Sequence, residues 1–165
     1  MIRIGLLSDT HNYLNPAVFE HFKDCDEIWH AGDIGTAAIT DAIAEFKPVR
    51  AVYGNIDGTD IRKTFPEHLM FRCEQMKVWI THIGGYPNRY DHRVKELIHR
   101  NPPDLFICGH SHILKVIYDK KLSLLHLNPG AAGKYGFQKV STLLRFTIDK
   151  KEVKDLQVIE LGKRR

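Results

Sequence analysis

Cysteine is scarce in this sequence of 165 residues. The three cysteines, Cys25, Cys73 and Cys108, are odd in number, and no two of them form a CxxC pair. A disulfide framework needs paired cysteines and a thiolate zinc site needs closely spaced ones, so both are excluded as organising features. We expect reduced thiols packed inside a cytoplasmic protein.

Long apolar runs are missing as well, and none approaches the roughly 20 residues of a membrane span. The apolar start ends at the polar Ser8, which is too early for the core of a signal peptide. We therefore expect a cytoplasmic protein with no membrane partner. A strong excess of one charge is also absent, since the formal net charge is +4. We interpret the basic end, residues 163–165, as a solvated chain end, so nucleic acid is not an expected partner.

The composition that is present, with 43% hydrophobic and 27% charged residues, is typical of a globular protein. The chain is long enough for one domain with a substantial core and too short for two ordinary ones. No linker, repeat or low-complexity segment divides it. We predict one domain over residues 1–165, and leave open whether it forms a homo-oligomer.

The first third of the chain alternates between predicted strands and helices. Strands are predicted at 2–7, 27–31 and 49–53. One helix is predicted to begin after Asn15-Pro16, and a second to run from Thr36 or Ala37 to Glu45. This order is typical of parallel βαβ units whose sheet is covered on both faces.

The rest of the chain has a different pattern. The predicted elements are strands at 69–73 and 77–82, a helix at 90–100, and strands at 105–108, 114–118, 122–127, 140–148 and 153–160. The last four strands are joined by hairpin turns. This antiparallel run predicts a second sheet packed on the first, so the predicted fold class is α/β.

Side chains suited to metal binding follow the predicted strands, mostly beside a glycine. They are Asp9, His11, Asp33, Asn55, His82, His110 and His112. Loops that follow parallel strands emerge at one edge of the sheet, so these side chains should converge. Imidazole together with carboxylate suits Mn, Fe, Co, Ni or Zn, whereas an all-oxygen set suits Mg or Ca. One carboxylate shared by two ligand sets is what two metal ions about 3.5–4 Å apart require.

Each short pattern has an ordinary explanation when it is taken alone. Asp9 and His11 are able to cap a turn, and residues 54–55 (Gly-Asn) are a common turn pair. Residues 109–112 (Gly-His-Ser-His) have few structural explanations, because they come straight after a buried strand. The ordered set of patterns is far more specific than any one of them.

The ordered motifs are Asp9-x-His11, Gly32-Asp33, Gly54-Asn55-x-Asp57, His82 and Gly109-His110-Ser111-His112. Together they resemble the calcineurin-like metallophosphoesterase superfamily, and its small branch of YfcE-like phosphodiesterases fits best. Residues 8–11 (Ser-Asp-Thr-His) and 128–130 (Asn-Pro-Gly) are also typical of that branch. The resemblance extends from residue 1 to about residue 133, which is most of the chain.

The resemblance implies two packed mixed β-sheets flanked by helices, a four-layer sandwich of the metallophosphoesterase type. It also implies two divalent transition-metal ions, with manganese expected before Fe, Co, Ni or Zn. The residues implied for the first ion are Asp9, His11, Asp33 and His112. The residues implied for the second ion are Asp33, Asn55, His82 and His110, so that Asp33 bridges the two.

The implied activity is hydrolysis of a phosphoester, most directly of a small or nucleotide-like phosphodiester. A hydroxide bridging the two ions would attack phosphorus, because metal binding lowers the pKa of water from about 15.7 toward about 7. Asp33 and Asn55 are the expected catalytic residues, as the bridge and as a phosphate contact. Behind the ligands we expect His30 as a buried support. Asp57 is expected to orient either a ligand imidazole or its loop, with a turn-forming role as the alternative.

Two positions depart from the pattern. Many members of the superfamily have a histidine after the asparagine of the third motif, and it is taken to donate a proton to the leaving group. Here that residue is Ile56, which has no proton to donate, so the general acid is unassigned and easy leaving groups should be favoured. In addition, residues 82–85 read His-Ile-Gly-Gly, whereas the family usually has glycine directly after this histidine.

Two other functions compete with the enzyme hypothesis. One is a non-catalytic scaffold, like the retromer subunit of the same fold whose metal site has decayed. The other is a nucleotide-binding protein that turns over poorly. A scaffold is expected to lose ligand histidines, and all four are present here.

Several residues that follow His82 are candidates for lining a substrate pocket, with an ordinary loop and helix start as the alternative. They are Tyr86, Arg89, Tyr90, His92 and Arg93.

Overall fold

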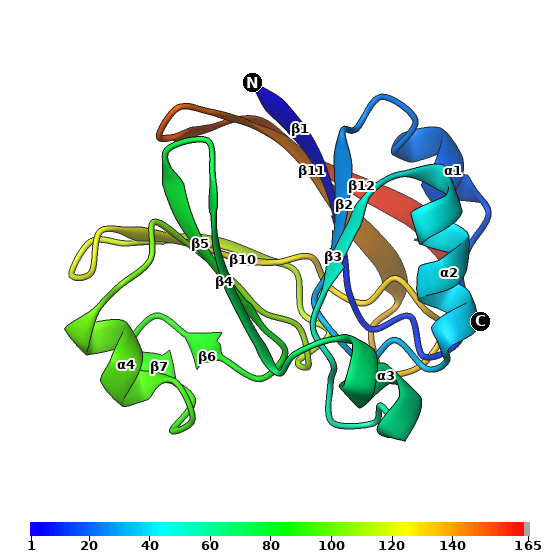
Figure 1. Ribbon diagram of the computed structural model, residues 1–165, viewed down its shortest axis with the longest axis horizontal. Coiled ribbons are helices and arrows are strands. Elements are labelled where there is room, and N and C mark those ends of the chain that lie inside the picture. The colour runs from blue at the N-terminus through cyan, green and yellow to red at the C-terminus, as the bar shows by residue number, and fades with distance from the viewer. Residues whose placement is uncertain (164–165) are drawn as a thin grey trace.

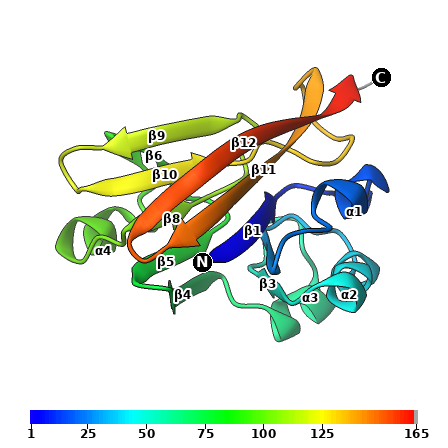
Figure 2. The ribbon, with the colours of Figure 1, turned by 90° about the horizontal axis from the view of Figure 1, so that it is seen from above.

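The computed structural model describes residues 1–163 and contains two β-sheets packed face to face, with helices on their outer sides (Figures 1 and 2). Arg164 and Arg165 of the basic end lie outside the described residues. None of the described helices is long and apolar enough to cross a membrane.

The first sheet has five strands in the order β12-β11-β1-β2-β3. Its parallel part consists of β1 (Ile2–Leu7), β2 (Glu27–His30) and β3 (Val49–Ala51), connected through α1 (Ala17–His21) and α2 (Ala37–Phe46). The long strands β11 (Val140–Asp149) and β12 (Glu152–Lys163) extend the sheet, with β11 antiparallel to β1. Because β1, β2 and β3 are parallel, the segments after them emerge at one edge.

The second sheet also has five strands, in the order β4-β5-β8-β10-β9. The strands are β4 (His68–Cys73), β5 (Met76–Thr81), β8 (Leu105–Ile107), β9 (Lys115–Asp119) and β10 (Leu124–Asn128). Helix α3 (Thr59–Thr64) precedes this sheet. Between β5 and β8 the chain forms a small hairpin, β6 (Gly85–Tyr86) with β7 (Arg89–Tyr90), and then α4 (Lys95–Arg100).

The period of two along β1 decides which side chains enter which core. Ile4 and Leu6 point into the main core between the sheets, where they pack with residues such as Ile80 and Ile107. Leu7 points to the opposite face, into a second core under α1 and α2. Residue 5 is glycine because a Cβ there would lie only 2.6 Å from the ring of Phe22. A third core fills the outer face of the second sheet, beneath α4 and the β6–β7 hairpin.

The predicted α/β class and the two packed mixed sheets flanked by helices are confirmed. The prediction that the late antiparallel run forms the second sheet was wrong. Strands β9 and β10 join the second sheet, but β11 and β12 return to the first. Leu144 and Phe146 on β11 belong to the main core beside Ile4 and Leu6. The apolar face of β11 therefore continues the apolar face of β1, which explains why β11 returns to the first sheet.

The helix predicted at 90–100 was too long. Tyr90 belongs to β7, and the helix begins at Lys95 after a turn at Asp91. The Oδ1 atom of Asp91 accepts hydrogen bonds from the main-chain N–H and the guanidinium of Arg93, which favours a turn over a longer helix.

Candidate metal centre

The seven predicted ligand residues lie in the loops that follow five strands. Asp9 and His11 follow β1, Asp33 follows β2, Asn55 follows β3, His82 follows β5, and His110 and His112 follow β8. Six of them form two groups in which the potential ligand atoms lie within 4.8 Å of one another. The first group is Asp9, His11 and His112, and the second is Asp33, His82 and His110. Asn55 lies beside the second group, with its Oδ1 3.0 Å from Nδ1 of His110.

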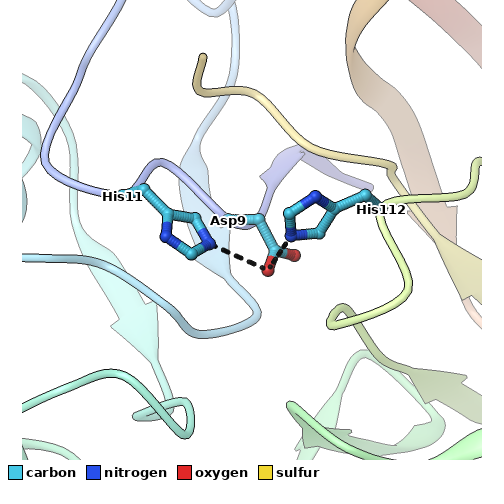
Figure 3. Close-up of side chains that lie close together, drawn as sticks. All are labelled: Asp9, His11 and His112. Carbon is cyan, nitrogen blue, oxygen red and sulfur yellow. Dashed lines mark ion pairs between the residues drawn. The ribbon is translucent and has the colours of Figure 1, made fainter. Parts of the chain in front are cut away.

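In the first group, the Asp9 carboxylate lies between two imidazoles (Figure 3). Its Oδ1 is 3.1 Å from Nε2 of His112 and 3.8 Å from Nε2 of His11. Its Oδ2 accepts hydrogen bonds from the Ser8 hydroxyl at 2.6 Å and from the main-chain N–H of His110 at 3.1 Å. One oxygen is therefore fixed by the protein, and the other faces the histidines.

In the second group, His82 donates from Nδ1 to the carbonyl oxygen of Ala31 at 2.7 Å. This contact directs Nε2 toward Oδ2 of Asp33, 3.1 Å away. The same Oδ2 lies 3.4 Å from Nε2 of His11 in the first group. The other oxygen of Asp33 accepts from the main-chain N–H of Ile56 at 3.1 Å. Asp33 thus faces both groups with a single oxygen.

Unusual backbone conformations occur at most of these residues. Five of them have a positive φ: Asp9 (54°), His11 (45°), Asp33 (56°), His110 (72°) and His112 (62°). The left-handed region costs about 1–2 kcal/mol for a residue with a Cβ, although Asp, Asn and His tolerate it best. Strain of this kind concentrates at functional sites, where the surrounding structure maintains it.

Close packing of the loops makes glycine necessary next to the ligands. A Cβ on Gly54 would collide with the carboxylate and main chain of Asp33. A Cβ on Gly32, which has a φ of 101°, would lie 2.6 Å from Nδ1 of His82. The glycines before Asp33 and Asn55 therefore let neighbouring loops approach to ligand distance.

The carboxylates and imidazoles shift each other's pKa values. Burial disfavours the charged form of Asp9, yet the nearby imidazoles of His11, His112 and His82 hold its pKa well below its usual value. For Asp33, burial is likewise outweighed by His82, and the pKa is lowered. The pKa of His112 is raised by the Asp9 carboxylate 3.1 Å away, and burial lowers the pKa of His82 less than Asp33 and Asp9 raise it. Burial lowers the pKa of His110.

Several atoms that face into the site have no hydrogen-bond partner among residues 1–163. They are Oδ1 of Asp9, Nε2 of His11 and Nε2 of His82. Leaving buried polar atoms unpaired costs about 1–3 kcal/mol each, so a cation that binds them removes a real penalty. The donor set of imidazole nitrogen and carboxylate oxygen fits a divalent transition metal.

Asp57 holds the loops rather than an imidazole. Its buried carboxylate accepts from the main-chain N–H groups of Ile34, Gly35 and Gly54 at 3.1, 2.9 and 2.8 Å. It therefore ties the loop that carries Asp33 to the loop that carries Asn55. Of the roles expected for Asp57, these hydrogen bonds support the one that orients its loop. The contacts with Gly54, three residues earlier, also form the turn that was the alternative.

His30 is fully buried below the first loop. Its Nδ1 accepts from the main-chain N–H of Gly32 at 3.1 Å, so Nε2 carries the proton and donates to the Thr10 hydroxyl at 3.0 Å. Thr10 in turn donates to the carbonyl of Ile34 at 2.8 Å. Burial lowers the pKa of His30 to about 4, which keeps the ring neutral.

Sequence reasoning missed the contribution of the segment that follows Gly133. The Oε1 atom of Gln138 accepts from Nδ1 of His112 at 3.0 Å, which directs Nε2 of that ring toward Asp9. The ring of Tyr135 stacks on His11 with 5.4 Å between centroids. Gln138 lies 26 residues beyond His112, so no local sequence signal could have linked them.

Comparison with known proteins identifies relatives along most of the chain. The family model of the calcineurin-like phosphoesterase superfamily domain matches residues 2–151. A probable metallophosphoesterase of Methanothermobacter thermautotrophicus is 32% identical over 135 residues, which cover 78% of this chain and 76% of that protein.

Solved structures share the fold at low sequence identity. A novel archaeal phosphodiesterase superposes with a TM-score of 0.73 and 24% identity over 97% of this chain and all (100%) of the other. The zinc complex of Vps29 from Entamoeba histolytica superposes with a TM-score of 0.75 and 16% identity over 97% of this chain and 98% of the other.

Proposed function

Because the chain belongs to the calcineurin-like phosphoesterase superfamily, we propose that it is a metal-dependent phosphodiesterase that hydrolyses a small or nucleotide-like phosphodiester. The proposed cofactor is a pair of divalent transition-metal ions, with manganese as the first to test. The ligands would be Asp9, His11, Asp33 and His112 for one ion, and Asp33, Asn55, His82 and His110 for the other.

One observation carries this proposal. Two ligand groups lie side by side, and their buried inward-facing atoms on Asp9, His11 and His82 lack partners. Asp33 supports the bridging role because its Oδ2 lies 3.4 Å from His11 and 3.1 Å from His82. Bound metal ions would neutralise charge on the phosphoryl oxygens and lower the pKa of a bound water.

The chain's own residues would orient the ester. The rings of His82 and His112 are fixed through Nδ1, by Ala31 and Gln138 respectively, so neither ring has to reorient when substrate binds. Asn55 is exposed; its Oδ1, 3.0 Å from Nδ1 of His110, would serve the second ion, and its side-chain N–H groups would donate to a phosphoryl oxygen. Ile56 is 46% exposed beside it and supplies no proton.

The test is hydrolysis of bis(4-nitrophenyl) phosphate after removal of metal by a chelator and reloading with Mn²⁺ or Zn²⁺. We expect release of nitrophenolate only after reloading, and a loss of at least about 100-fold in rate for His110→Gln. His99→Gln is the matched control, because His99 is exposed and outside both ligand groups. Full activity of the metal-free protein, or of His110→Gln, would contradict the proposal.

A second candidate is a metal-binding scaffold with little or no turnover. The likeness to a Vps29 that was solved with zinc favours it, as does the missing proton donor at Ile56. Stoichiometric metal binding without hydrolysis of any aryl diester would support the scaffold over the enzyme.

A further inference from the structure

A cavity of about 270 Å³ opens beside the second ligand group. It is lined by Tyr53, Gly54, Asn55, Arg62, Glu67, Thr81, His82, Ile83 and Arg93. Asn55 and His82 connect it directly to the candidate metal centre. Of the five residues expected from sequence to line a pocket, Arg93 does so here.

The guanidinium of Arg62 is held in place by main-chain carbonyls. Its Nε donates to the carbonyl of Asp57 at 2.7 Å, and Nη2 donates to the carbonyl of Asn55 at 3.3 Å. Its Cζ lies over the ring of Tyr53, 4.5 Å from the centroid. Within residues 1–163 no carboxylate forms an ion pair with Arg62. A fixed guanidinium of this kind, uncompensated by a carboxylate, is suited to binding an anion.

Arg93 brings a second guanidinium to the same cavity from the segment before α4. Its Nη1 lies 3.0 Å from Oδ1 of Asp91, which sets its direction. Glu67 is the acidic side chain of the lining, and it accepts a hydrogen bond from Tyr53 at 3.3 Å. Because Arg93 is ion-paired with Asp91, Arg62 is the guanidinium of the lining whose charge no carboxylate pairs with among residues 1–163, and it is the group that favours an anion over a cation.

The size of the cavity restricts what else it accepts. Sites for drug-sized ligands occupy about 300–1,000 Å³, so a cavity of about 270 Å³ suits a small group rather than a whole nucleotide. One face of the Tyr53 ring is already covered by Arg62, which reduces the area for stacking a base.

We propose that this cavity binds a second anionic group of the substrate, a phosphate or a carboxylate carried on one of the two ester alcohols. The inference rests on the proposed phosphodiesterase function and narrows its substrate class. The reacting phosphoryl group would lie at the two ligand groups, and the second anion would bind Arg62 and Arg93.

The first experiment uses a series of 4-nitrophenyl phosphodiesters whose second alcohol ends in a methyl, carboxylate, phosphate or trimethylammonium group. With the Mn²⁺-loaded protein we expect kcat/KM for the better anionic ester to exceed that for the methyl ester by roughly tenfold or more, and the cationic ester to be the poorest. The carboxylate and phosphate esters distinguish the two sources of negative charge.

Variants connect the preference to the cavity. Arg93→Gln should bring the ratio of anionic to methyl ester toward one, and this ratio is insensitive to a general loss of active protein. Arg62→Gln should act in the same direction, although it also removes two hydrogen bonds from the Asn55 loop. Arg89→Gln is the matched control, since Arg89 is exposed on β7 and does not line the cavity.

A binding experiment supplies a readout other than turnover. Calorimetry of the Mn²⁺-loaded protein would compare phosphonoacetate through phosphonohexanoate with alkylphosphonates of the same length. One spacer length should bind roughly tenfold more tightly than the alkylphosphonate of the same length, which lacks the carboxylate, and Arg93→Gln should abolish the difference while Arg89→Gln keeps it.

The possible failures are distinguishable. If no diester is hydrolysed, the proposed function is wrong and this inference falls with it. Hydrolysis of all esters at equal kcat/KM, or a preference unchanged in Arg93→Gln, overturns the inference alone.

Discussion

Nε2 of His82 lies 3.1 Å from Oδ2 of Asp33, although 49 residues separate them in the sequence. The ring is held from behind by the carbonyl of Ala31, so the nitrogen that faces Asp33 is the one left for a ligand. Both side chains are held by the main chain through their other polar atom, so these two facing atoms form half of a candidate metal site.

Asp33 should matter to both ions, because its Oδ2 faces both ligand groups. We expect Asp33→Ala to reduce metal binding at both positions, whereas His11→Ala should weaken mainly one. Elemental analysis after loading with Mn²⁺ measures the metal content per chain, with His99→Gln as the control. Retention of both ions by Asp33→Ala would show that Asp33 is not the bridge.

Asp57 should be among the most sensitive residues that do not face the site. Asp57→Ala leaves three main-chain N–H groups unpaired, at about 1–3 kcal/mol each, so we expect a loss of at least about 3 kcal/mol in the free energy of unfolding. Asp57→Asn keeps one acceptor and should lie between this variant and the unaltered protein. Urea unfolding measures both.

The exposed Asp60→Asn is the control for charge at this position of the chain. Because the two ligand loops would no longer be tied together, metal affinity of Asp57→Ala should also fall by about 10–100-fold. An alanine variant as stable as the asparagine variant would mean that the three hydrogen bonds contribute little.

The rate of hydrolysis should depend steeply on the leaving group. A positioned acid is typically worth about 10²–10⁴-fold, and Ile56 supplies none. We expect rates to fall steeply across aryl diesters of rising leaving-group pKa. A flat dependence, with chemistry limiting the rate, would mean that another residue donates the proton. His92, an exposed histidine in the segment after His82, would then be the first to replace.

Because of His126, the protein should become less stable as the pH falls. Neither ring nitrogen has a hydrogen-bond partner among the described residues, and burial lowers its pKa to about 4 from the ordinary 6.5. Between pH values of about 4 and 6.5, His126 is protonated in the unfolded chain and neutral in the folded protein. The contribution that neutral His126 makes to stability is therefore fully present above about pH 6.5 and is lost as the pH falls toward 4.

His126→Leu removes this titration. Each pKa unit corresponds to about 1.4 kcal/mol, so the variant should gain about 3 kcal/mol in free energy of unfolding relative to the unaltered protein between pH 7 and pH 4. His99→Gln is the control, since His99 is exposed. Burial also lowers the pKa of His30, but His30 is present in both proteins, so its effect on the pH dependence cancels in the comparison. Parallel pH curves for the two proteins would contradict this assignment.

The sequence alone determined which side chains approach one another. Asp9, Asp33 and Asn55 each follow a strand of the parallel part, and parallel strands end at one edge whatever the details of packing. Local order along the chain was therefore enough to bring these three side chains to one edge and to predict that two sheets pack together. His82, His110 and His112 follow β5 and β8 of the second sheet, and they meet the first three through the packing of the two sheets. Local order was also enough to show that the side chain of Ile56 has no proton to donate to a leaving group.

Only the tertiary structure decided the remaining features. The return of β11 to β1 depends on pairing between residues more than 130 positions apart, such as Ile4 with Phe146, and the same alternating pattern would have suited the other sheet. The contact of Gln138 with His112 and the meeting of Arg62 with Arg93 in one cavity arise in the same way. Such contacts follow from how separate segments pack, and no local periodicity or motif records that packing.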